Sequence, residues 1–238
     1  MGQQLARLVH RAEDLLIPVH CEEVTLELFL AWPQLDEQIS KWDAVDRRGN
    51  REQFRNRRYV VRSLDRFYAF ESQPALKATL EKNWKLLHTC IQDKDPYHHF
   101  PLETRFSEAG QLRTRLNKKT GLKFIGQMPV ELGDRKIMFD NIIDAAVPVA
   151  LWIENTERSA ADISREIEAI FQSASLTCFD TVADCLMQSR ADTNNHTARE
   201  LRLLVDCPER WPESLPKPVS QSTQKNELFE DDESIVSL

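Results

Sequence analysis

The sequence predicts an α/β protein in which about five short strands form a mostly parallel or mixed sheet with helices on both faces. Apolar runs of strand length alternate along the chain with stretches of helical periodicity, which is typical of a sheet covered by helices. Residues 149–153 are apolar on both alternating faces, as expected of a central strand that is buried on both sides. These two observations carry the fold prediction.

In the first half of the chain, strand patterns alternate with amphipathic helices. Alternating apolar and polar side chains predict a strand over residues 22–30, which we place at an edge of the sheet, and residues 58–63 predict a second strand. Ser63 is expected to cap the helical region that follows, and Pro74 to restart this region in the first turn of a new helix. Helices are expected at residues 3–16, 34–42 and 64–91, and a polar loop at residues 46–56.

The second half predicts three further strands. Residues 122–128 form a strand after Gly121, which we expect to end a polar helix, and residues 149–153 form the central strand. Ser159 opens the next helix, and residues 200–206 form the last strand. Helices are expected at residues 107–118, 137–144, 159–171 and 177–189, and a polar loop at residues 191–197.

The composition indicates one sizeable domain with appendages. Hydrophobic residues make up 41% and charged residues 29% of the 238 residues, and the net charge is −7. No apolar run approaches the roughly 20 residues of a membrane-spanning helix, and the first helix lacks the apolar core of an export signal, so we expect a cytoplasmic protein. The predicted parts are an N-terminal helix (1–19), an α/β domain (20–212) and an acidic, disordered tail (213–238).

Charged residues follow three of the predicted strands. Asp65 and Arg66 follow the second strand, Glu154 follows the central strand, and Asp206 follows the last. Because ligands and acid–base groups gather beyond the carboxyl ends of parallel strands, these residues and Arg62 form the candidate interaction or ligand site. The alternative, more common for such acids, is that each one caps the following helix or turn.

No pattern in the chain predicts a catalytic residue, a cofactor or a metal. The sequence has six glycines, and none are arranged in the phosphate-binding patterns GxGxxG or GxxxxGK. The five cysteines lack paired CxxC spacing, which favours reduced, buried thiols, and Cys207 has no local signature of a catalytic cysteine. The nearest approach to a set of zinc ligands, which matches no closed four-ligand pattern, is His88, Cys90, His98 and His99.

A basic stretch runs from Arg47 to Arg66. It contains eight arginines against the two acids Glu52 and Asp65, so it is a candidate for binding the phosphates of nucleic acid. The acidic balance of the remaining chain argues against this interpretation. Arginines beside Asp65 are equally suited to hold the fold together through paired guanidinium groups.

Four segments, in this order, resemble the C-terminal domain of the von Willebrand A–MoxR associated proteins of bacterial conflict systems. The segments are Leu26-Glu27-Leu28-Phe29-Leu30 with Leu35 and Trp42, Val60-Val61-Arg62-Ser63-Leu64-Asp65-Arg66, Val147-Pro148-Val149-Ala150-Leu151-Trp152, and Leu203-Leu204-Val205-Asp206-Cys207-Pro208-Glu209-Arg210-Trp211-Pro212. The family usually has a tryptophan or small residue and a second acid near Asp206, where this chain has Val205 and Cys207. No site is carried over at that position.

The resemblance implies a regulatory or adaptor module without enzymatic activity in an anti-phage or conflict system. Its implied partners are an AAA+ ATPase, a von Willebrand A protein, and a protease or other effector. Two alternatives stay open: a hydrolase or nuclease that uses the strand-end carboxylates with a divalent cation, and a nucleic-acid-binding protein that uses the Arg47 to Arg66 stretch. A structure that places the three carboxylates at different ends of the sheet excludes the first alternative.

Overall fold

The computed structural model describes residues 25–35, 37, 39–45, 51–92, 100–105, 109–154, 157–171, 179–192 and 194–212. The predicted N-terminal helix, the histidine pair 98–99 and the tail from residue 213 lie outside these residues. Those predictions therefore stay predictions, and so does the division of the chain into parts.

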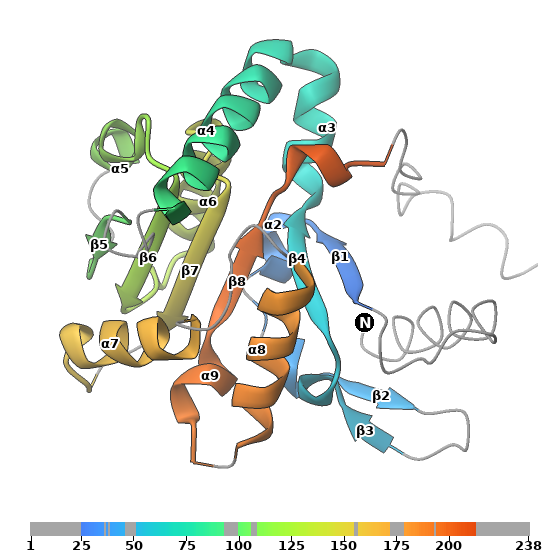
Figure 1. The fold of residues 1–238 in the computed structure, drawn as a ribbon. Helices are drawn as coiled ribbons and strands as arrows, with labels where there is room; N and C mark the ends of the chain where they lie inside the picture. Colours follow the sequence, from blue (N-terminus) through green and yellow to red (C-terminus); the bar gives the residue numbers. More distant parts are fainter. Residues whose placement is uncertain are drawn as a thin grey trace, which may run out of the picture.

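Six strands form one sheet in the order β1-β4-β8-β7-β6-β5 (Figure 1). The strands are β1 (Leu26–Leu30), β4 (Tyr59–Ser63), β5 (Leu102–Glu103), β6 (Gly121–Gly126), β7 (Val149–Glu154) and β8 (Arg202–Val205). A separate antiparallel hairpin is formed by β2 (Asp43–Val45) and β3 (Arg51–Gln53). The predicted α/β fold with a mostly parallel, mixed sheet is confirmed.

The sheet consists of two parallel halves that meet at its centre. β1, β4 and β8 run parallel to one another, and β5, β6 and β7 also run parallel to one another. The two halves meet in the antiparallel pair of β7 and β8, where Val149 lies opposite Val205 and Trp152 lies opposite Arg202. The carboxyl ends of the strands in one half therefore lie at one end of the sheet, and those of the other half lie at the opposite end. The predicted edge position of β1 is confirmed, but β1 is parallel to its neighbour.

Helices cover both faces of the sheet, as predicted. The helices are α2 (Trp32–Leu35), α3 (Leu64–Ser72), α4 (Pro74–Gln92), α5 (Ala109–Leu116), α6 (Leu132–Asp144), α7 (Ala160–Phe171), α8 (Phe179–Ala191) and α9 (His196–Glu200). The described residues also include the short 3-10 helices η2 (Ile39–Lys41), η3 (Phe54–Asn56) and η5 (Pro208–Arg210). α4, α7, α8 and α9 pack on one face, and α2, α5 and α6 pack on the other (Figure 1).

β7 shows why its sequence predicted a strand buried on both sides. Val149, Leu151 and Ile153 belong to the apolar core under α7 and α8, whereas Ala150 and Trp152 belong to the core under α5 and α6. All five side chains are at most 2% exposed. Since burying a large apolar side chain contributes about 1.5–3 kcal/mol, the alternation fixes which side chains face each helical layer.

Two local predictions are confirmed by backbone geometry. The Ser63 hydroxyl accepts a hydrogen bond from the Arg66 N–H at 3.1 Å and so caps α3. Pro74 is the first residue of α4, where its missing N–H costs no helical hydrogen bond.

The role predicted for Gly121 is wrong, because this residue opens β6. α5 ends at Leu116, and the chain turns through Lys118, whose φ is 60°. A Cβ atom at Gly121 would lie 2.3 Å from the Phe100 ring, so glycine is required here for close packing. Sequence periodicity does not reveal such a contact.

Two segments predicted as loops contain short regular structure. Residues 46–56 include β3 and η3, and residues 191–197 include the start of α9. The Asn195 side chain caps α9 by accepting a hydrogen bond from the Ala198 N–H. Both elements are too short to produce a periodic signal in the sequence.

Among the described residues, no helix is both long enough and apolar enough to cross a membrane.

Candidate functional site

Three of the five predicted site residues meet inside the protein. Arg62 lies at the end of β4, Arg66 in the first turn of α3, and Asp206 directly after β8. Arg66 Nη1 lies 2.5 Å from Asp206 Oδ2, and Arg62 Nε lies 3.9 Å from Asp206 Oδ1. β4 and β8 are parallel neighbours, so their carboxyl ends bring these residues together. All three are 0% exposed.

Asp206 is hydrogen-bonded on both carboxylate oxygens. Oδ1 accepts a hydrogen bond from the Ser63 N–H at 3.1 Å, and Oδ2 accepts one from Arg66. Arg66 also donates to the Ile142 carbonyl of α6 at 2.9 Å. Burial raises the pKa of the Asp206 carboxyl, while Arg66, Arg62 and the Ser63 N–H act in the opposite direction. The carboxylate thus joins β4 and α3 to the end of β8, and Arg66 extends the network to α6.

Arg62 extends the same network to the chain that follows β8. It donates to the Cys207 carbonyl at 2.5 Å and to the Arg210 carbonyl at 2.7 Å. Its guanidinium also pairs with Glu27 of β1 at 2.7 Å, and Glu27 pairs in turn with the Arg210 side chain at 2.6 Å. The arginine therefore connects η5 to β1.

Aromatic rings enclose this network. The Arg62 guanidinium lies 4.9 Å from the centre of the Phe29 ring and 5.2 Å from that of Trp211. Trp211 stacks on Phe70 and Phe67 of α3, with ring centres 4.5 Å and 5.3 Å apart. Arg62, Arg66 and Asp206 are thereby kept from solvent, so these three charges form an internal tie between elements.

Asp65 has a capping role. Its Oδ2 accepts a hydrogen bond from the Trp32 N–H, the first amide of α2, at 2.6 Å. Burial raises the pKa of the Asp65 carboxyl, and the Trp32 N–H lowers it. The alternative interpretation expected such an acid to cap the following helix or turn, whereas Asp65 caps α2, a helix that precedes it in the chain.

Glu154 lies away from the other four residues. It is the last residue of β7 and is paired with Gly126 at the end of β6. Asp206 lies near the beginning of β7, where its N–H donates to the Pro148 carbonyl at 2.8 Å. Because β7 and β8 are antiparallel, the expected convergence of Glu154 with Asp65 and Asp206 does not occur. Asp65, Glu154 and Asp206 therefore do not form the shared site that the hydrolase hypothesis placed at these three residues.

The arginine stretch is not a continuous exposed band. Arg62 and Arg66 are internal, and Arg58 forms an ion pair with Asp184 of α8 at 2.6 Å. Arg47 and Arg48 lie outside the described residues. Several of these arginines hold the fold together, as the alternative interpretation expected.

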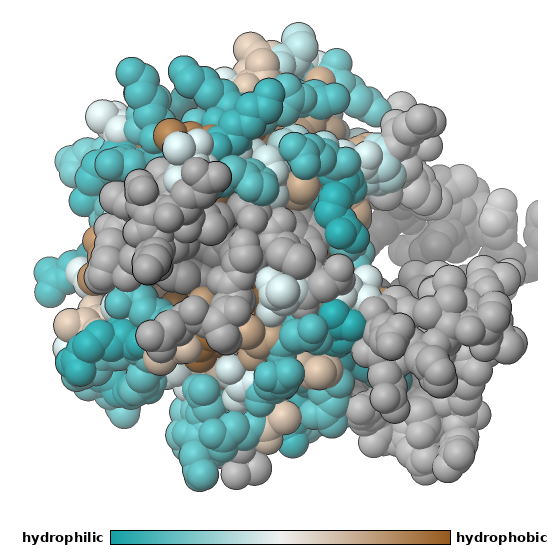
Figure 2. Space-filling view, in the orientation of Figure 1, coloured by the Kyte–Doolittle hydropathy of each residue, from teal (hydrophilic) through white to brown (hydrophobic). Residues whose placement is uncertain are grey.

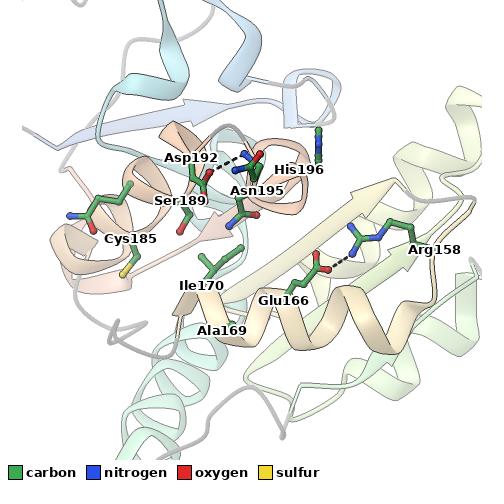
Figure 3. A pocket seen from close by; sticks show the side chains of 11 residues that line it. Arg158, Glu166, Ala169, Ile170, Cys185, Ser189, Asp192, Asn195 and His196 are labelled. Carbon is green, nitrogen blue, oxygen red and sulfur yellow. Dashed lines mark hydrogen bonds and ion pairs between the residues drawn. The ribbon is translucent and has the colours of Figure 1, made fainter.

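Sequence patterns did not indicate an open groove of about 790 Å³ between α7, α8 and α9 (Figure 3). Glu166 lines it and is bonded to Arg158 and to the Thr197 hydroxyl, which tie α7 to α9. The Thr197 hydrogen bond, followed by Arg158, lowers the pKa of the Glu166 carboxyl. Figure 3 shows the side chains of Cys185 and His196 apart from each other, so they do not form a thiol–imidazole pair.

A second groove, of about 690 Å³, lies at the carboxyl ends of β5 and β6. Its lining includes Thr104, Arg105, Met128, Val130 and Asp134. Val130 is 77% exposed, and the nearby Leu132 is 69% exposed. On the face drawn in Figure 2, the described residues are mainly hydrophilic and the apolar ones form small separate areas. The apolar residues directly after β6 were the available sequence signal for this groove.

Cysteine and metal chemistry gain no support from the geometry. Burial raises the pKa of the Cys207 thiol, which disfavours the reactive thiolate. Within the described ranges, no three or more side chains among His, Cys, Asp and Glu are grouped so as to hold a metal ion.

Comparison with known proteins gives one match. The family described as the vWA-MoxR associated protein C-terminal domain matches residues 1–208. No curated protein and no solved structure matches the chain.

Proposed function

The chain belongs to the family of vWA-MoxR associated protein C-terminal domains, and from this membership we propose that it is a non-enzymatic adaptor of a conflict system. It links a sensor or an AAA+ ATPase of the MoxR type to an effector such as a protease. The family is named for its association with vWA and MoxR proteins, so these are the partners that the proposal names first.

The observation that carries this proposal is the contrast between a tied interior and an exposed apolar rim. The charged residues at the ends of β4 and β8 are bonded to one another inside the protein. Val130 and Leu132, in contrast, stand exposed beside the groove at the carboxyl ends of β5 and β6. Exposed large apolar residues next to a groove are typical of protein-binding surfaces. We assign the first protein contact to this rim.

The test is co-purification of the full chain with the vWA protein and the MoxR ATPase encoded in the same system. We expect a stable complex, and we expect the double variant Val130→Ser, Leu132→Ser to weaken it at least about tenfold, since buried apolar anchors dominate such contacts. The matched control is Leu86→Ser, which removes an apolar side chain that is 42% exposed on α4. It should leave the complex unchanged.

Two results would contradict the proposal. One is that neither protein associates with the chain at concentrations that keep all three folded. The other is that the purified chain turns over a substrate and loses this activity in a folded variant. Equal weakening by the rim and control variants would leave the adaptor role standing and would move the contact away from the rim.

A further inference from the structure

The groove at the carboxyl ends of β5 and β6 has three walls. They are formed by the segment after β5, by the segment that leads from β6 into α6, and by the start of α7. The groove volume of about 690 Å³ lies within the roughly 300–1,000 Å³ that is typical of binding sites, so it holds several side chains of a partner. Ile125 and Met128 line the groove and are each 2% exposed, which gives it an apolar base.

The exposed apolar rim of this groove is held in a fixed shape. Pro129 precedes Val130, and its ring restricts the backbone φ angle. The Arg135 side chain donates to the Pro129 carbonyl at 2.5 Å, and the Arg135 N–H donates to the Glu131 carbonyl at 3.1 Å. Val130 and Leu132, which are 77% and 69% exposed, therefore stand on a backbone that needs little ordering when a partner binds.

Charges of opposite sign lie on different walls. Asp134, in the first turn of α6, and Arg105, which follows β5, both line the groove and are exposed. Glu131, also exposed, lies between the two apolar rim residues in the sequence and adds negative charge to the α6 wall. Arg158, the other cation of the lining, is paired with Glu166. The α6 wall thus favours a cation of the partner, and the β5 wall favours a carboxylate.

The strand edge beside the groove offers little to an extended partner. β5 is the edge strand and has only two residues, so a strand added to it would gain few backbone hydrogen bonds. An α-helix, in contrast, carries an apolar stripe with charged residues along its two flanks. It can set apolar side chains against Val130 and Leu132 while its flanks meet Asp134 and Arg105.

We propose that this groove binds an amphipathic helix of the partner, with a basic flank toward Asp134 and an acidic flank toward Arg105. The inference rests on the proposed adaptor function for the location of the contact, and it adds the chemistry of the partner. The two charges also fix the direction in which the helix lies. A helix turned end for end would set its flanks against walls of like charge.

The first test uses the full chain and three synthetic helical peptides, so it does not require the natural partner. All three carry the same leucine stripe, and their flanks are lysine and glutamate, lysine only, or glutamate only. Fluorescence anisotropy measures binding to the variants Asp134→Lys and Arg105→Glu. The matched controls, Glu71→Lys on α3 and Lys85→Glu on α4, make the same change of net charge at exposed positions.

The expected result is a switch of peptide preference. Relative to its control, Asp134→Lys should shift the preference toward the glutamate peptide by about tenfold, and Arg105→Glu should shift it as far toward the lysine peptide, because attraction at one wall becomes repulsion. The wild type should prefer the mixed peptide to a greater extent than either variant does. High salt should reduce all these differences.

A second measurement uses the complex with the vWA and MoxR proteins. At low salt we expect Asp134→Lys and Arg105→Glu to lower the association rate about threefold to tenfold with little change in the dissociation rate, since exposed charges at the edge of a contact act mainly on association. Glu71→Lys and Lys85→Glu should leave both rates unchanged. A general loss of folding would not produce this division between the two rates.

Three outcomes overturn the inference. One is that Val130→Ser, Leu132→Ser weakens the complex while both charge variants behave like their controls, which keeps the adaptor contact and removes the assigned chemistry. Another is that a mixed peptide interrupted by proline binds as tightly as the helical one, which excludes a helix. The third is that none of the three peptides binds. A switched peptide preference without a complex would support the helix-binding groove and contradict the proposed vWA and MoxR partners.

Discussion

At the scale of single residues, burial decides what the charged groups do. Arg62, Arg66 and Asp206 have the side chains and strand-end positions of a ligand site, but each is fully enclosed and bonded to protein atoms. In an enclosed position, a charge contributes by satisfying its partner, and removing one member leaves the other uncompensated.

Asp206→Asn should therefore destabilise the protein strongly. Loss of the carboxylate leaves Arg66 without its counter-charge, and we expect the free energy of unfolding to fall by about 3–5 kcal/mol. Urea denaturation followed by circular dichroism measures this change. The control is Asp162→Asn, which breaks an exposed ion pair with Arg165 and should cost less than about 1 kcal/mol. Similar losses for the two variants would show that the buried network does not hold the fold.

At the scale of elements, a few contacts fix how neighbouring segments meet. Gly126 ends β6, and a Cβ atom there would lie 2.1 Å from the Thr104 carbonyl oxygen. Glu166 joins α7 to Thr197 of α9 and to Arg158 in the connection between β7 and α7. Each contact gives a prediction about the packing of one element on another.

Gly126→Ala should force apart the segment after β5 and the end of β6. The added methyl group meets backbone rather than a movable side chain, and we expect a loss of about 1–3 kcal/mol, as for overpacked cores. Thermal unfolding measures it. Gly133→Ala in α6 is the control, because apart from its chain neighbours and the backbone of its own helix no atom lies within 4 Å of the added Cβ. It should be neutral or stabilising by up to about 1 kcal/mol, since alanine favours helix, and a loss equal to that of Gly126→Ala would refute the close-contact explanation.

The Glu166 contact predicts a dependence of stability on pH. The Thr197 hydroxyl and Arg158 lower the pKa of Glu166 in the folded protein below its ordinary value of 4.5. The folded state therefore binds fewer protons than the unfolded state in this range. The contribution is fully present above pH 4.5 and is lost as the pH falls below that value through the lower pKa of the folded state. Denaturation of the wild type and Glu166→Gln across this range tests the prediction. The difference in stability should shrink toward acid, and a constant difference would contradict it.

At the scale of the whole molecule, the direction of β8 organises the protein. The chain leaves β7 at one end of the sheet, passes through α7, α8 and α9, and enters β8 at that same end (Figure 1). β8 is consequently antiparallel to β7 and parallel to β4. This connection places the buried ion pair of Arg66 and Asp206 at one end of the sheet and the groove beside Val130 at the opposite end.

Local sequence patterns were sufficient to predict the elements whose signal spans a few residues. Apolar alternation identified β7, serine and proline positions identified the starts of α3 and α4, and ordered motifs identified the family. It also placed Arg62, Arg66 and Asp206 together, because β4 and β8 both end at these residues. These features follow from side-chain periodicity and backbone capping, which act over a few residues.

The relative direction of the two halves of the sheet and the burial of the charges could not be predicted locally, because both depend on contacts between segments far apart in the chain. Nothing local in residues 202–205 states which neighbour β8 pairs with or in which direction, because parallel and antiparallel strands present the same apolar side chains to both faces. That choice separated Glu154 from Asp206. The enclosure of the arginines likewise depends on rings from β1, α3 and the segment after η5, which come together only when the chain is folded.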